Sequence, residues 1–260
     1  MGVRTATVAV PAGPGTSTSE MPPMTVFLVA GVAVVLGAVV QSGVGLGLGV
    51  IAAPVVTLLD PGLMPGSMLV AGAFLPVLIL AREARHTDWP GVSWALAGRV
   101  AGTAAGIWLL AAVPVQALGV LVGAAVLVVI AAGGLGRELP RNRWTLLGAG
   151  VVSGTTGTAT SIGGPPVAVL YQREHGARVR ATLSLFLCVG NSLAIAALAA
   201  AGRMPARDVA AGLIFLACAA VGLAAAARFR RFLDGGRIRA AVLVTASVSA
   251  IILIAHSLIP

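Results

Sequence analysis

The sequence predicts an all-α, polytopic membrane protein with two inverted repeats, each a broken or re-entrant helical hairpin followed by three transmembrane helices. Of the 260 residues, 58% are hydrophobic and only 10% are charged, whereas soluble domains carry about 25% charged residues. The apolar residues fall into stretches long enough to cross the roughly 30 Å hydrocarbon core of a bilayer. Two of these stretches are longer than a single span and are interrupted by glycine and proline.

The chain divides around these stretches. Residues 1–24 are rich in Pro, Gly, Ser and Thr, which predicts a flexible N-terminal tail. The first membrane repeat is expected at 25–134, a cytoplasmic linker at 135–142 and the second repeat at 143–259. Single spans are expected at 63–81, 93–112, 114–134, 181–201, 207–227 and 238–259.

The first interrupted stretch, 25–59, carries no charge and contains a run at 43–49 in which glycine alternates with apolar residues, followed by Pro54. A helix interior loses roughly 1 kcal/mol for each Gly and about 3 kcal/mol for each Pro relative to Ala. Irregular backbone at membrane depth survives only where protein buries it or where it lines a cavity. The sequence leaves open whether 25–59 forms a re-entrant hairpin or two short spans.

The second interrupted stretch, 143–171, contains a run of Gly, Thr, Ser and Pro at 153–166. Arginine-rich connections flank it on both sides, and arginine in short loops marks the cytoplasmic face. The stretch should therefore enter and leave the membrane by the same face, as a hairpin. The same rule places the C-terminus outside and gives the two halves opposite orientations, which is the pattern of an inverted repeat.

The paired breaks predict an anion site near the bilayer midplane. A half-helix that starts inside the membrane presents unpaired N–H groups with partial positive charge, and such an end binds anions. Pro54, Pro165 and Pro166 are expected in the first turn of the outgoing half-helices, where the missing N–H costs little. The alternative is close helix packing, because small residues also fill membrane helix interfaces.

The predicted substrate-binding residues come from the two breaks and from one amide in the next span: Gln41, Ser42, Gly43, Gly45, Gly47, Gly49, Pro54, Ser153, Gly154, Thr155, Thr156, Gly157, Thr158, Thr160, Ser161, Gly163, Gly164, Pro165 and Asn191.

Three polar residues stand apart from the breaks. Asn191 falls near mid-depth in its span and needs a partner, either another helix or the substrate. Arg99 could complement an anion on its path, but its place near the start of span 93–112 favours a side chain that snorkels to the cytoplasmic interface. Arg180 is expected to anchor a helix start at the cytoplasmic face, and it could also collect anions there.

The segments 43–54 and 153–166 together resemble the paired signature of the sulfite exporter TauE/SafE family, whose members include permeases similar to four-toluene-sulfonate uptake permeases. The resemblance covers about 25–259 and extends to Arg180-Ala181-Thr182 and to Asn191. It implies a multi-pass protein of a bacterial plasma membrane that moves small sulfur-containing anions or organosulfonates. The sequence departs from the family pattern at 157–161, where hydroxyl residues replace a denser glycine run.

We therefore expect a membrane permease that moves, and more specifically exports, a sulfur oxyanion or sulfonate. Export is favoured because none of the 8 acidic residues is expected inside a span, and the inside-negative potential alone drives an anion outward. Neither a cofactor nor a metal is expected, and the partners are the anion and the lipid bilayer, not nucleic acid. Homo-oligomerisation stays open.

Three alternatives differ from a permease. An anion channel would use the same site. An intramembrane serine hydrolase would need a base within reach of Ser153 or Ser161, and the only histidine in a span is His256 at its far end; we therefore expect no enzyme. A non-transporting scaffold would not need two broken segments at matched positions.

Overall fold

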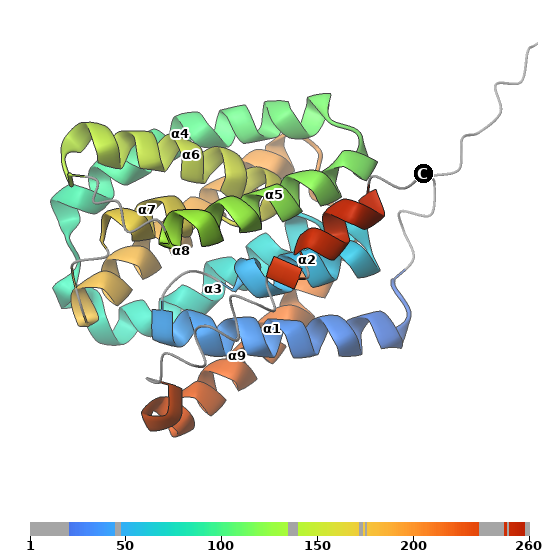
Figure 1. Cartoon of the computed structure of the whole chain (residues 1–260), viewed down its shortest axis with the longest axis horizontal. Helices are drawn as coiled ribbons and strands as arrows, with labels where there is room; N and C mark the ends of the chain where they lie inside the picture. Colours follow the sequence, from blue (N-terminus) through green and yellow to red (C-terminus); the bar gives the residue numbers. More distant parts are fainter. Residues whose placement is uncertain are drawn as a thin grey trace, which may run out of the picture.

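The computed structural model describes residues 21–44, 48–134, 140–171, 174, 176–233, 247–248 and 250–257, and the described part is helical with no strand (Figure 1). Its first half contains α1 (Met24–Val44), α2 (Gly49–Leu59), α3 (Gly66–Glu83), α4 (Trp89–Ala112) and α5 (Val115–Gly134). Its second half contains α6 (Arg143–Thr160), α7 (Pro165–Leu170), α8 (Ala177–Ala200) and α9 (Ala206–Leu233). Residues 247–248 and 250–257 are also helical, and two 3₁₀ turns lie at Pro61–Leu63 and Ala84–His86.

Among the residues that the structure describes, five helices are long and apolar enough to cross a membrane, which confirms the prediction of an all-α membrane protein. These candidate spans are Met24–Gln41, Gly66–His86, Trp89–Ala112, Ala177–Ala200 and Ala206–Ala226. The tail at 1–20, most of the linker at 135–142 and the C-terminal residues 258–260 lie outside the described residues. The inverted orientation of the two halves stays a prediction.

The first interrupted stretch forms one span-length helix followed by a half-length helix. Helix α1 has 21 residues and α2 has 11. At 1.5 Å per residue α2 is about 16 Å long, too short to cross the hydrocarbon core. The expected position of Pro54 in the first turn of the outgoing helix is wrong, because α2 already begins at Gly49 and Pro54 lies inside it.

The second interrupted stretch has the same order, a longer helix followed by a short one. Helix α6 has 18 residues and ends at Thr160, and the next residue, Ser161, adopts a left-handed conformation with φ of 61°. Helix α7 has 6 residues and begins with Pro165 and Pro166. These two prolines therefore stand in the first turn, as predicted, where no backbone N–H is needed.

Helix packing crosses between the two halves of the chain. Helix α4 packs along α6, α1 packs along α9, and α3 lies against α8; Figure 1 shows α4 and α6 side by side at one edge of the molecule. The α4–α6 contact depends on glycine, since a Cβ on Gly154 would lie 2.6 Å from the carbonyl oxygen of Arg99 and a Cβ on Gly102 would overlap the backbone of α6. Small residues let two membrane helices approach this closely, so part of the glycine pattern serves packing.

Ion pairs join the two halves where α3 ends. The guanidinium of Arg180 contacts the carboxylate of Glu83, with NH2 to Oε1 at 2.6 Å. Close by, Asp88 accepts a 2.9 Å hydrogen bond from the hydroxyl of Tyr171 and lies 3.5 Å from the guanidinium of Arg141. These contacts tie the α3–α4 connection to the first turn of α8, to the residue that follows α7 and to the segment before α6.

A further ion pair, between Arg207 and Asp60, joins the halves near the start of α3. The neighbouring Asp208 contradicts the expectation that no acidic residue lies inside a span. It stands in the first turn of α9, within the candidate span Ala206–Ala226, and only 3% of it is exposed. A helix N-terminus favours a negative charge, which is the physical reason that a carboxylate is tolerated at this end.

Candidate functional site

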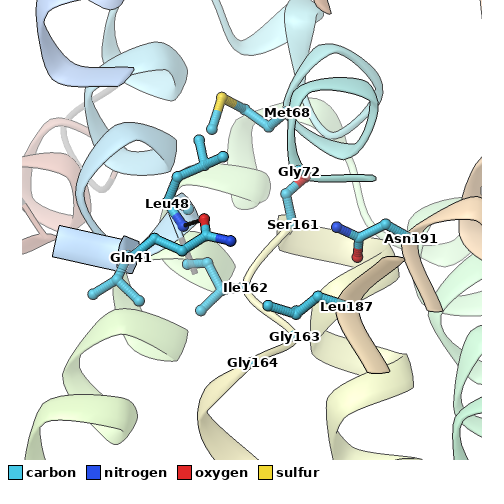
Figure 2. Close-up of a pocket in the computed structure, with 12 residues that line it drawn as sticks. Gln41, Leu48, Met68, Gly72, Ser161, Ile162, Gly163, Gly164, Leu187 and Asn191 are labelled. Atoms are coloured by element: carbon cyan, nitrogen blue, oxygen red, sulfur yellow. Dashed lines mark hydrogen bonds between the residues drawn. The ribbon is translucent and has the colours of Figure 1, made fainter. Parts of the chain in front are cut away.

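A pocket lies where the two breaks meet. Its lining comes from the end of α1, the start of α2, α3, the segment between α6 and α7, and α8 (Figure 2). The lining residues are Gln41, Leu48, Gly49, Val50, Met68, Gly72, Ser161, Ile162, Gly163, Gly164, Leu187 and Asn191.

The two breaks touch through backbone at Gly49. A Cβ on Gly49 would lie 2.6 Å from the carbonyl oxygen of Ser161, closer than a side chain allows. Glycine at this position therefore lets the first turn of α2 meet the left-handed residue that ends α6.

On the first break, the side chain of Gln41 closes the gap between α1 and α2. Its Oε1 accepts a hydrogen bond of 2.7 Å from the backbone N–H of Leu48. This bond satisfies one of the N–H groups that a helix start leaves unpaired. Because the oxygen of the amide is occupied, its NH2 group points into the pocket, toward the side of Asn191 (Figure 2).

On the opposite wall, Asn191 of α8 has the same arrangement. Its Oδ1 accepts a hydrogen bond of 2.8 Å from the guanidinium of Arg99. Its Nδ2 lies toward Gly72, where a Cβ would stand only 2.9 Å away, and Gly72 lines the pocket. The predicted need for a partner is thus met by another helix, while the amide nitrogen still faces the pocket (Figure 2).

Arg99 is fully buried, so the expectation that it snorkels to an interface is wrong. Its exposed fraction is 0%. NH1 of its guanidinium donates a hydrogen bond of 3.0 Å to the hydroxyl of Ser153, and the guanidinium carbon lies 4.9 Å from the centre of the Phe186 ring. Helix α4 begins at Trp89, earlier than expected. Arg99 therefore stands about 15 Å along the helix, near its middle and out of reach of either end.

Six of the predicted site residues line the pocket: Gln41, Gly49, Ser161, Gly163, Gly164 and Asn191. Ser153 lies behind the wall, where its hydroxyl contacts Arg99 and the carbonyl of Gly163. Gly45 and Gly47 lie outside the described residues, and the side chain of Ser42 and the surroundings of Gly43 are also outside them.

The other predicted residues of the breaks do not line the pocket. The hydroxyls of Thr155, Thr156 and Thr160 bond to carbonyls one turn back in α6. Thr158 is buried against the position of Gly106 in α4. Pro54, Gly154, Gly157 and Pro165 are buried near the breaks without reaching the pocket.

The apolar part of the lining was not predicted. Leu48, Val50, Met68, Ile162 and Leu187 give the pocket an apolar side, and α3 contributes to it although its sequence carries no break. Nothing distinguishes these residues from lipid-facing or core residues in the sequence, because every span is rich in them.

Arg180, predicted as an anchor or as a residue on the anion path, is paired with Glu83. Its Nε and NH2 contact both carboxylate oxygens at 2.6 to 3.2 Å. This contact lies at the end of α8 away from the pocket, and its role on an anion path stays a prediction.

Among the residues that the structure describes, no group of three His, Cys, Asp or Glu side chains could hold a metal ion. The two serines weighed as nucleophiles are engaged elsewhere. The hydroxyl of Ser161 donates to the carbonyl of Pro65 at 2.9 Å, and that of Ser153 to the carbonyl of Gly163.

Comparison with known proteins gives one family. The family model described as "Sulfite exporter TauE/SafE" matches residues 29–253, most of the chain and all of the pocket. Neither the curated proteins nor the solved structures contain a match.

Proposed function

The chain belongs to the sulfite exporter TauE/SafE family, and from this premise we propose that it exports a small sulfur oxyanion or sulfonate through the pocket between its two helix breaks. It is a multi-pass membrane transporter and not an enzyme. The identity of the anion, its direction and the site are the proposal.

The observation that carries the proposal is the orientation of two amides across the pocket. Gln41 and Asn191 each have their oxygen occupied, by the N–H of Leu48 and by Arg99. An amide offers two N–H donors besides its oxygen, so the groups that face the pocket from both walls are donors. A ligand that only accepts hydrogen bonds, such as the oxygens of a sulfite or a sulfonate, matches this arrangement.

The start of α2 adds to these donors. The first N–H groups of a helix have no partner within the helix, and α2 begins at Gly49, in the pocket wall. The N-terminus of α7 contributes less, because Pro165 and Pro166 lack N–H groups. The predicted anion site between two helix ends is therefore replaced, in our proposal, by one helix end and two amides.

Alternating exposure of the pocket is supported by the order of the elements. Each half has a long helix, a short helix and then further helices, and the packing of α4 on α6 corresponds to that of α1 on α9. Two-fold related halves produce such exchanged contacts. The ion pairs Glu83–Arg180 and Asp60–Arg207 stand at the two ends of α3, on either side of the pocket, where they could open in turn.

Export is supported by the absence of acidic side chains from the described lining of the pocket. Proton-coupled uptake generally keeps an ionisable group in the transport path. The membrane potential supplies about 2.3 kcal/mol per charge per 100 mV to an anion that leaves an inside-negative cell. Asp208 and Glu83, the acidic residues that fall within candidate spans of the described part, stand near helix ends and do not line the pocket.

The test is flux of sulfite, thiosulfate, sulfate and taurine in proteoliposomes at a set potential. A membrane potential that is negative inside the vesicles should accelerate the efflux of at least one sulfur oxyanion or sulfonate. Counterflow, in which unlabelled anion on one side accumulates labelled anion, is expected of a permease and is not given by an open channel. Proteoliposomes without anion flux above protein-free vesicles would refute the proposal.

A further inference from the structure

We propose that Arg99 is the fixed counter-charge of the transported anion, and that it restricts the site to anions carrying one negative charge. This inference rests on the proposed function, because it concerns the cargo of the same pocket.

The first observation is that Arg99 carries an unbalanced charge. A guanidinium stays protonated in proteins, and this one is 0% exposed near the middle of α4. Its partners are neutral: the hydroxyl of Ser153, the amide oxygen of Asn191 and the ring of Phe186. Among the described residues, no carboxylate forms an ion pair with Arg99. Buried charges are ordinarily paired with an opposite charge.

The second observation is that hydrogen bonds within the protein do not fully satisfy the group. The Nε of Arg99 is buried without a hydrogen-bond partner. A guanidinium has five N–H donors and no acceptor. Because Nε faces Gly190, a nearby anion would offset the charge of the group and would not bond to Nε.

The third observation is the closeness of this charge to the pocket. Gly163 lines the pocket, and a Cβ on it would lie 2.6 Å from NH1 of Arg99. A Cβ on Gly157 would lie 3.1 Å from NH2, and one on Gly190 would overlap Nε. These three glycines, from α6, the second break and α8, thus form a cradle for the guanidinium. The backbone at Gly163 lies between the guanidinium and the pocket.

The position of Asn191 completes the link, because it touches both groups. Its oxygen holds the guanidinium and its nitrogen faces the pocket (Figure 2). The charge of Arg99 orients this amide, so that its donors point toward the anion. Arg99 brings one positive charge, and the described lining has no acidic side chain, so a singly charged anion leaves the occupied site neutral. A doubly charged anion would leave a net negative charge in a poorly polarisable interior, where an uncompensated charge is costly.

The experiment compares anions of different charge in proteoliposomes. Methanesulfonate, which is singly charged at every pH used, should be transported at least roughly thirtyfold faster than sulfate, in line with the cost of an unpaired buried charge. Sulfite flux at fixed total concentration should rise as the pH falls, since hydrogensulfite then replaces the doubly charged form. Methanesulfonate flux over the same pH range is the internal control.

Two variants test the residue itself. Asn191→Asp places a carboxylate against Arg99 with almost no change in shape, and it should lower methanesulfonate flux at least roughly thirtyfold because the cation is then neutralised from within. Arg99→Gln removes the charge and should cause a similar loss. Arg82→Gln, which removes one positive charge at the exposed end of α3, is the matched control and should leave flux and charge selectivity unchanged.

The outcomes separate the two proposals. Wild-type protein that moves no anion overturns the proposed function, and this inference with it. Wild-type protein that moves sulfate as fast as methanesulfonate overturns this inference alone, and so does normal flux in Asn191→Asp. Size-exclusion chromatography establishes whether Arg99→Gln is folded; if it is not, the result of Asn191→Asp decides.

Discussion

The hydroxyl of Ser161 donates a hydrogen bond of 2.9 Å to the carbonyl of Pro65, 96 residues earlier in the chain. This bond joins the break in the second half to the residue that precedes α3 in the first half. It places the left-handed turn that ends α6 against the start of a span-length helix, so that the pocket has a wall from each half.

Ser161→Gly should be more stable than Ser161→Ala. Both variants lose the hydrogen bond to Pro65, but Ser161 has a φ of 61°, a conformation that glycine adopts freely and that costs other residues about 1 kcal/mol. Thermal unfolding in detergent would compare the two variants with the wild type. An Ala variant as stable as the Gly variant would show that the left-handed conformation at residue 161 carries no strain.

Gly163→Ala should reduce anion flux by at least about tenfold, the loss that 1.4 kcal/mol gives. The added Cβ would lie 2.6 Å from NH1 of Arg99 and 3.1 Å from the carbonyl of Ser153, which displaces either the guanidinium or the pocket wall. The matched control is Gly148→Ala in α6, where a Cβ would meet nothing within 4 Å. Flux in proteoliposomes should be unchanged in this control, and equal flux in both variants would remove Gly163 from the site.

Gln41→Leu and Gln41→Glu should separate stability from transport. Leucine leaves the N–H of Leu48 without its acceptor and should cost about 1–3 kcal/mol of stability. Glutamate keeps that acceptor but brings a negative charge to the pocket, so stability should be retained while anion flux falls. Unfolding temperature and flux, measured on the same preparations, would show this divergence. Normal flux in Gln41→Glu would exclude an anion beside Gln41.

The Glu83–Arg180 ion pair should stabilise the contact between the end of α3 and the first turn of α8. In a double-mutant cycle with Glu83→Gln and Arg180→Gln, we expect a coupling free energy of about 1 kcal/mol, because the pair is only partly exposed. The side chains are 18% and 26% exposed. The cycle is measured by thermal unfolding in detergent at low salt, and additive effects of the two substitutions would mean that the pair does not stabilise this conformation.

The broken helices were predictable because glycine and proline act locally. The run at 43–49 and the run at 153–166 each interrupt an apolar stretch, and the structure begins new helices at Gly49 and Pro165. The position of Pro54 was not predictable in the same way. Where a helix begins depends on what its first turn touches, and here Gly49 touches the carbonyl of Ser161, which is far away in sequence.

The threonines of the second break show a second limit. Their hydroxyls were expected to face a ligand, but Thr155, Thr156 and Thr160 bond to carbonyls of their own helix. Ser and Thr inside helices often bond in this way. Hydroxyl content alone therefore could not tell a ligand donor from a residue satisfied within its helix.

The sequence by itself determined the class of the protein and the location of both breaks, and it drew attention to Asn191. These features follow from composition, from the local cost of glycine and proline, and from a lone amide in an apolar span. Only the tertiary structure decided the position and the contacts of Arg99. From the sequence alone, a charged residue near the end of an apolar stretch is expected to snorkel to the interface. Its burial becomes evident only when the bounds of its helix and the glycines around it are known. Packing of α4 against α6 and α8 decided that Arg99 lies behind the pocket wall, since the cradle is made by residues more than 50 positions away in the chain.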